Sequence, residues 1–122
     1  MRFFFIVLSG ICLSLVGNAG PYAECFEGNI RSKISEMGCD LNGQTIQMAF
    51  AQSKRSCAVV GTNEILPKIT SPEQLLPAVE QLQAGMKPFF VILVNAKIKS
   101  CGFRGEFKFN PDGRGGELNL IR

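Results

Sequence analysis

The chain has 122 residues, enough for one domain, with 13 basic residues, 10 acidic residues and no histidine. The missing histidine excludes the commonest general base at neutral pH and every Ser-His or Cys-His nucleophile pair. The small net charge of +3 argues against an obligate nucleic-acid partner.

The first nineteen residues have the pattern of a secretory signal peptide. Arg2 supplies a positive start, residues 3–16 are uncharged and mostly apolar, and Gly17 and Ala19 provide small residues at a cleavage site. As a helix, residues 3–16 would reach only about 21 Å, too short for a bilayer core of about 30 Å. We therefore expect residues 1–19 to be removed, leaving one secreted domain, 20–122, with no membrane span.

Four cysteines remain after this cleavage, because the fifth lies in the signal peptide. They are Cys25, Cys39, Cys57 and Cys101. An even number of cysteines in a short secreted chain predicts two disulfides, and four cysteines allow three pairings. Their spacing contains no zinc knuckle, so we expect no metal site and no cofactor.

The first half of the mature chain predicts one helix and two strands. Asn29 is a good helix N-cap and Gly38 a good helix stop, which favours a short helix between them. Residues 45–50 alternate apolar and polar side chains, and residues 57–61 form a short apolar run. We expect these two segments to pair as a β-hairpin.

The second half predicts one helix followed by three strands. Ser71 and Gln74 form a capping-box pattern, and Gly85 marks the end of the helix that they begin. Strands are expected over 88–99, 102–109 and 115–121, the last two joined by an Asn-Pro-Asp-Gly turn. The fold class is therefore predicted as α+β: one small disulfide-stabilised domain, with one or two helices and an antiparallel β-sheet of about four to five strands.

No set of residues in the chain has the pattern of a catalytic site. The ten carboxylates are scattered over turns and polar faces, so we expect a protein that is not an enzyme. Arg104 and Lys108 share the polar face of the last hairpin and could meet an acidic partner, with RNA as an alternative. The segment 60–72 is expected to be an exposed loop that presents Glu64 and Ile65 to a partner.

Two segments carry a resemblance to a known family. The early "YAEC", with Tyr22 and Cys25, and the late "EFKFNPDGRGGELNLI" resemble the ribonuclease-like secreted effectors of powdery mildew fungi. The resemblance implies a ribonuclease-like fold with Cys25 bonded to Cys101 and Cys39 to Cys57. It also implies a non-catalytic virulence factor of a plant-pathogenic fungus, which binds a host protein to suppress defence and is open to recognition by a host immune receptor.

Two other classes of protein share the signal peptide and the even number of cysteines. One is a bacterial periplasmic or secreted inhibitor or immunity-type binding protein, acting through the loop 60–72. The other is a secreted killer-toxin-like antimicrobial protein, a class that is usually more basic and richer in cysteine. In each case we expect a monomer.

Overall fold

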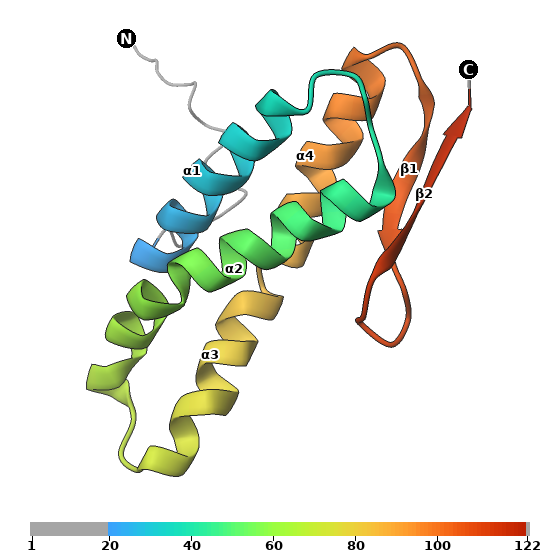
Figure 1. Cartoon of the computed structure of the whole chain (residues 1–122). Coiled ribbons are helices and arrows are strands. Elements are labelled where there is room, and N and C mark those ends of the chain that lie inside the picture. The colour runs from blue at the N-terminus through green and yellow to red at the C-terminus, as the bar shows by residue number, and fades with distance from the viewer. Residues whose placement is uncertain (1–19, 122) are drawn as a thin grey trace, which may run out of the picture.

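The computed structural model describes residues 20–121, so the predicted signal peptide lies outside the described residues. This part of the chain folds into four α-helices, two short 3₁₀ turns and one β-hairpin (Figure 1). The elements are α1 Pro21–Glu36, α2 Gly43–Ile65, η2 Leu66–Lys68, η3 Pro72–Gln74, α3 Leu75–Ala84, α4 Lys87–Ser100, β1 Arg104–Phe109 and β2 Gly116–Ile121.

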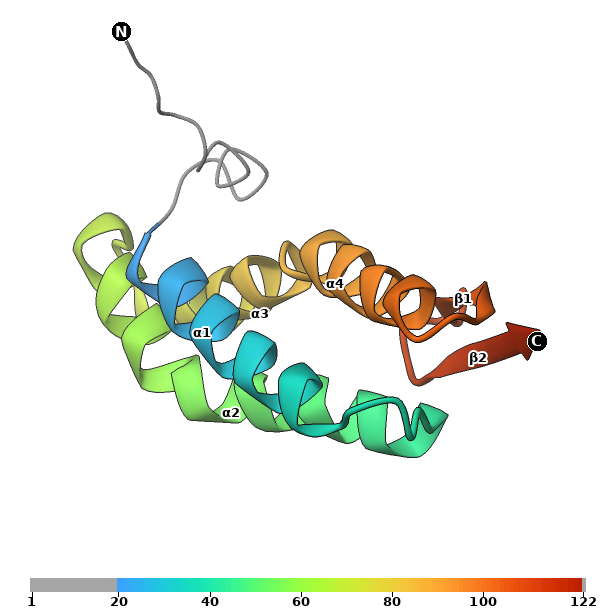
Figure 2. The same ribbon diagram turned by 90° about the horizontal axis from the view of Figure 1, so that it is seen from above.

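The helices are arranged around α2, the longest of them. Helix α1 packs along α2, and α4 packs against α1 (Figures 1 and 2). Helix α3 contacts α2 and leads directly into α4, whereas the hairpin covers α4 through β1 and the start of α2 through β2. None of the helices within residues 20–121 is both long and apolar enough to cross a membrane.

The expected α+β fold with four to five strands is wrong, because the described sheet has only two strands, β1 and β2. The segments 45–50 and 57–61 both belong to α2, which Asn42 caps by accepting the N–H groups of Gln44 and Thr45. The alternation over residues 45–50 rests on only three apolar residues, Ile46, Met48 and Phe50. In the helix, Met48 is half exposed, and the buried positions follow a spacing of three and four residues instead.

The segment 88–99 was also predicted as a strand, and it forms most of α4. A continuous apolar run does not distinguish a strand from a buried helix, because neither periodicity is visible in it. The start of the run favours the helix, since Pro88 lies in the first turn, where its missing N–H costs nothing. Phe90, Val94 and Ile98 then repeat at four-residue intervals, and all three are buried.

The core contains a cluster of aromatic rings contributed by α1, α2, α4 and β1. The ring of Phe50 lies 5.4 Å from that of Phe26, 4.8 Å from that of Phe90 and 5.2 Å from that of Phe109. Phe107 closes the cluster from the hairpin, 5.8 Å from Phe90, and is fully buried. Phe107 and the partly buried Phe109 of the last hairpin therefore belong to the core, where they pack on helices and not on a larger sheet.

Small side chains on α2 let α1 approach closely. Ala49, Ser53, Cys57 and Gly61 recur every four residues, and all are buried. A row at this spacing lies along one face of a helix. The row ends at Gly61, where the ring of Tyr22 occupies the space that a side chain would fill.

The two predicted disulfides are present, and their pairing differs from the one that the resemblance implied. Cys25 is bonded to Cys57, which joins α1 to α2, and Cys39 is bonded to Cys101, which joins the ends of α1 and α4. The bond between Cys39 and Cys101 therefore fastens the chain just after the first helix, and the bond between Cys25 and Cys57 joins two helices. Cys57 lies within α2, so Cys25 is joined to a helix and not to the strand expected over residues 57–61.

The expected helix between Ser71 and Gly85 is confirmed, including the capping box of Ser71 and Gln74. Its first turn is 3₁₀, and the regular α-helix begins only at Leu75. Pro77 then lies within the first turn of α3, where a missing N–H is tolerated.

Candidate functional site: an apolar pocket between four helices

A pocket of about 600 Å³ lies where the start of α1, the end of α2, α3 and the start of α4 meet. Its lining is mostly apolar. The lining residues are Tyr22, Ala23, Glu64, Ile65, Ala78, Gln81, Leu82, Gly85, Met86, Pro88, Phe89 and Ile92.

Helix α3 provides one wall of the pocket. Ala78, Gln81, Leu82 and Gly85 follow each other at intervals of three, one and three residues, so they lie on one face of the helix. No residue of α3 is fully buried. The face toward the pocket is therefore mostly apolar and stays partly exposed to solvent.

The opposite walls are more firmly packed. Met86 and Phe89 at the start of α4 are buried, as are Tyr22 and Ala23 at the start of α1. Ile92, one turn along α4 from Phe89, is 46 % exposed and lies at the open rim. The pocket thus has a fixed apolar floor and an opening to solvent.

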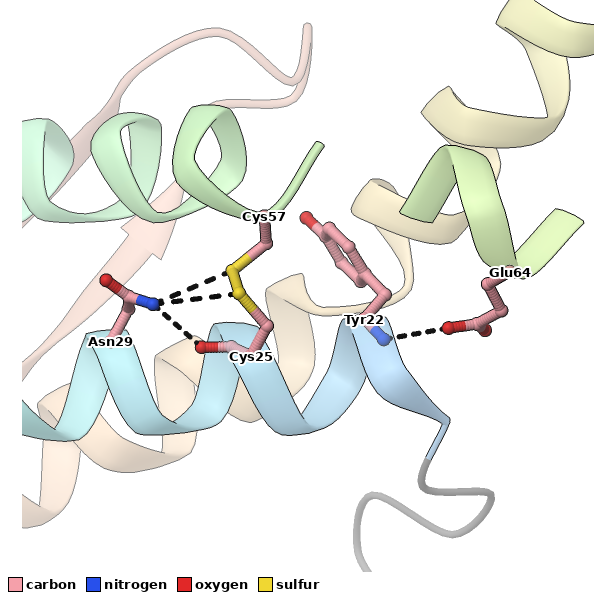
Figure 3. Close-up of a disulfide and its surroundings, with 5 residues drawn as sticks. All are labelled: Tyr22, Cys25, Asn29, Cys57 and Glu64. Atoms are coloured by element: carbon pink, nitrogen blue, oxygen red, sulfur yellow. Dashed lines mark hydrogen bonds between the residues drawn. A yellow bond between two sulfur atoms is a disulfide. The ribbon is translucent and has the colours of Figure 1, made fainter. Parts of the chain in front are cut away.

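Glu64 is the one acidic residue of the pocket wall. Although it lies far from α1 in the sequence, it also caps the N-terminus of that helix. The N-cap residue of α1 is Gly20, which has no side chain to accept the unpaired N–H groups of the first turn. Oε1 of Glu64 accepts the backbone N–H of Tyr22 at 2.7 Å instead (Figure 3). A negative charge at this end of a helix also interacts favourably with the helix dipole.

The phenol of Tyr22 is buried, and its hydroxyl has no hydrogen-bond partner among the described residues. Burial raises the pKa of Tyr22 from 10.0 to about 12. The ring packs on Gly61 of α2, and it lies beside the disulfide Cys25–Cys57 in the interface between α1 and α2 (Figure 3). Tyr22 therefore stays protonated at neutral pH and gives the pocket an aromatic wall.

The size and the mostly apolar lining of this arrangement suit a small ligand. The lining has one carboxylate, that of Glu64, and contains no cysteine, lysine or arginine. Within residues 20–121 no group of three or more Cys, Asp or Glu side chains is placed to hold a metal ion.

Two of the residues predicted to bind a partner, Glu64 and Ile65, do lie together in the pocket wall. They do not lie in the exposed loop that is predicted over residues 60–72. Residues 60–65 are the last turns of α2 and not an exposed loop, and only residues 69–71 are free of regular structure before η3. The side chains are placed by a helix end and not by a flexible segment.

The other two predicted residues, Arg104 and Lys108, lie apart from the pocket. Both are exposed on β1, none of whose residues lines the pocket. Lys108 Nζ forms a salt bridge of 3.2 Å with Glu106 on the same strand. Glu106 thus lies between these two basic residues on β1 and is paired with one of them.

A second, more basic hollow of about 320 Å³ lies where the hairpin turn meets α2 and α4, and sequence reasoning missed it. Lys54 Nζ lies 5.3 Å from the ring centre of Phe50, and Lys87 Nζ lies 5.1 Å from that of Phe109. Lys87 also donates to the carbonyl of Gly113. Lys87 thus joins the start of α4 to the hairpin, whereas Lys54 lies over a ring of its own helix, α2.

Sequence reasoning also missed the pocket residues of α3 and α4. The spacing of Ala78, Leu82 and Gly85 was a usable signal, since it marks one helix face. Phe89 and Ile92 could not be found in this way, because the segment 88–99 is predicted as a strand.

Comparisons of the chain with models of known protein families, with curated proteins and with solved structures give no match. The class of protein that fold and site define is therefore a small, disulfide-linked helical protein with an apolar pocket.

Proposed function

We propose that this chain is a secreted, non-catalytic binding protein whose pocket takes a small, uncharged, apolar molecule. The observation that carries the proposal is the mostly apolar hollow of about 600 Å³ between α1, α2, α3 and α4. Pockets for small ligands typically measure about 300–1,000 Å³ and are lined by apolar and aromatic side chains with a few polar groups.

The charge of the lining indicates the kind of ligand. Glu64 is the only acidic residue of the lining, and no lysine or arginine lines the pocket. An anion such as a fatty-acid carboxylate would find no cation in the lining to pair with. An uncharged ligand needs no such partner, and Gln81 offers it one hydrogen-bonding side chain.

Secretion is supported by two independent features. The first nineteen residues have the pattern of a signal peptide. The structure pairs all four remaining cysteines as disulfides, which form and persist mainly in oxidising compartments.

The narrower expectation of a fungal effector acting on a host protein rests on the resemblance alone. The helical fold and the pairing of Cys25 with Cys57 differ from what the resemblance implied, so neither adds support to it. The expectation stays a prediction, tested by finding the gene in a plant pathogen and its transcript during infection. The pocket proposal does not depend on the outcome.

A dye titration tests the proposed pocket. The secreted, oxidised protein is titrated with the uncharged dye phenylnaphthylamine, whose emission rises in apolar surroundings, and with its anionic analogue anilinonaphthalene sulfonate. We expect saturable binding of the uncharged dye and weaker binding of the sulfonate, because no lysine or arginine lines the pocket to pair with the anion.

Two matched variants locate the dye. Ala78→Trp places a large side chain in the pocket wall, whereas Ala84→Trp changes an exposed residue of the same helix outside the lining. We expect Ala78→Trp to weaken binding by about tenfold or more, equivalent to about 1.4 kcal/mol, and Ala84→Trp to leave it unchanged. Equal binding by both folded variants, judged by circular dichroism, would contradict the proposal.

A further inference from the structure

Gly20 lies against the carboxylate of Glu64 at a distance that a side chain would not tolerate. A Cβ atom on Gly20 would lie 2.8 Å from Oε2 and 3.0 Å from Oε1 of Glu64. Real Cβ atoms essentially never have a neighbour closer than 3.0 Å. The same distance is ordinary for a hydrogen bond from a charged nitrogen to a carboxylate oxygen, about 2.7–2.9 Å.

We propose that hydrolysis of the Ala19–Gly20 peptide bond creates an ion pair between the new N-terminal ammonium and Glu64. One water is consumed, Ala19 leaves as a carboxylate with residues 1–19, and the nitrogen of Gly20 becomes a protonated amine. That nitrogen is joined to Cα by a single bond of about 1.46 Å. Rotation about the Cα–C bond of Gly20 brings it to the position of the absent Cβ, next to Oε2.

The rotation leaves the start of α1 undisturbed. The carbonyl of Gly20 accepts the N–H of Glu24 at 3.0 Å, and Oε1 of Glu64 accepts the N–H of Tyr22 at 2.7 Å. Neither bond involves the nitrogen of Gly20 or Oε2 of Glu64. Only a chain end can rotate in this way, because the nitrogen of an uncleaved chain is still bonded to Ala19.

The carboxylate also offsets an unfavourable charge. A positive group at the N-terminus of a helix is repelled by the helix dipole, and α1 begins at Pro21, directly after Gly20. Two acids face this end, Glu64 from α2 and Glu24 from the first turn of α1, and no basic residue lines the adjoining pocket. The pair would therefore hold the ammonium in its charged form and raise its pKa above the ordinary value of about 8.

The inference deepens the proposed function and rests on its secreted, processed state. With its charge balanced by the N-terminus, Glu64 no longer makes the pocket wall negative. The pocket of the mature protein would then favour an uncharged ligand over a cation. In the uncleaved chain Oε2 would lack this partner.

The first test is the mass of the protein secreted with its own first nineteen residues. A mass that begins at Gly20 is expected, and a mature chain that begins at any other residue would overturn the inference. The outcome is independent of dye binding, so its failure and the failure of the proposed pocket are told apart.

The second test is the pKa of the N-terminal amine, followed by NMR in protein labelled with isotopic glycine. We expect the pKa in the wild type to lie about one unit or more above that in Glu64→Gln. The glutamine can still accept the N–H of Tyr22, so this variant should fold. Glu80→Gln changes an acid on α3 that is exposed and outside the lining, and should leave the pKa unchanged. The same pKa in the wild type and in Glu64→Gln would overturn the ion pair.

The pH dependence gives an independent readout. Because the folded state raises the pKa of the amine, the stabilisation is fully present below about pH 8 and is lost as pH rises through the folded value. The melting temperature of the wild type should therefore approach that of Glu64→Gln at alkaline pH. A difference between the two that does not change with pH would contradict the pair.

Discussion

The ring of Tyr22 packs directly on Gly61, so that α1 and α2 meet at the edge of the pocket without a side chain between them. A Cβ on Gly61 would lie 3.1 Å from Cδ1 of Tyr22 and 3.3 Å from Cδ2 of Leu82. These contacts are tighter than nine in ten real Cβ contacts. The absence of a side chain at this one position thus places both an aromatic ring and a leucine of α3.

Replacing this glycine should therefore destabilise the protein. We expect Gly61→Ala to lower the free energy of unfolding by about 1–3 kcal/mol, because Tyr22 and Leu82 must both move. Gly28→Ala is the matched control, since Gly28 lies in α1 with nothing within 4 Å of its would-be Cβ. That change should raise stability by about 0.5–1 kcal/mol, the usual gain in helix propensity. Urea unfolding measures the stability of both variants. A Gly61→Ala variant that is as stable as Gly28→Ala, or more stable, would contradict this packing.

The buried phenol of Tyr22 should make stability fall at alkaline pH. Burial raises its pKa from 10.0 to about 12, so the folded state holds the proton more tightly than the unfolded state. This contribution is complete below about pH 10 and is lost between about pH 10 and pH 12, at a total cost of about 2 kcal/mol. The chain has one tyrosine and no tryptophan, so phenolate absorbance reports Tyr22 alone.

Tyr22→Phe is the control for this titration. Its stability should equal that of the wild type at neutral pH, or exceed it by about 1 kcal/mol, because the hydroxyl has no partner among the described residues. The difference in stability between the two proteins should then widen in favour of the variant above about pH 10. A difference that stays constant would mean that the phenol ionises as freely as in the unfolded chain.

The two disulfides should be reduced in a fixed order. Cys39 is exposed, whereas Cys57 is fully buried against α1. We expect limited reductant followed by alkylation and mass mapping to label Cys39 and Cys101 before Cys25 and Cys57. Loop length does not reverse this, since sequence separations of 62 and 32 differ by only about 0.6 kcal/mol in closure entropy. Labelling of Cys25 and Cys57 first would show that the α1–α2 interface opens more readily than the structure implies.

A single side chain of α4 should control how firmly the hairpin is attached. Oδ1 of Asn95 accepts the backbone N–H of the buried Phe107 at 2.9 Å. Asn95→Ala leaves that N–H without its acceptor, so we expect a loss of about 1–3 kcal/mol and faster amide exchange in β1. Asn95→Asp keeps an acceptor and should retain most of the protection. Equal exchange in the wild type and in both variants would contradict the role of Asn95.

The parts of the fold that were predicted correctly depend on patterns of a few neighbouring residues. Ser71 and Gln74 form a capping box in four residues, and the turn at 110–113 is specified by its own composition. The number of disulfides followed from the even set of cysteines, whereas their pairing depends on which helices pack together. The packing of distant helices, and with it the disulfide pairing, cannot be predicted from short sequence patterns.

The helices α2 and α4 were missed because tertiary packing decides their identity. Ile46 and Phe50 fit a strand and a helix equally well, and Phe89 and Phe90 stand in an unbroken apolar run. The pocket could not be predicted for the same reason, because its walls come from four helices that only tertiary packing brings together. Only Glu64 and Ile65 were selected in advance, and they were selected as part of a loop that is in fact a helix end.

The most direct test of the central claim is methyl NMR of the secreted, oxidised protein during titration with phenylnaphthylamine. The account predicts that the methyl signals of Ile65, Leu82, Met86 and Ile92, which line the pocket, shift together and saturate. The methyl groups of Ile34 and Leu118, which lie outside the lining, should stay in place. Shifts that spare the pocket, or that spread evenly over the molecule, would contradict the account.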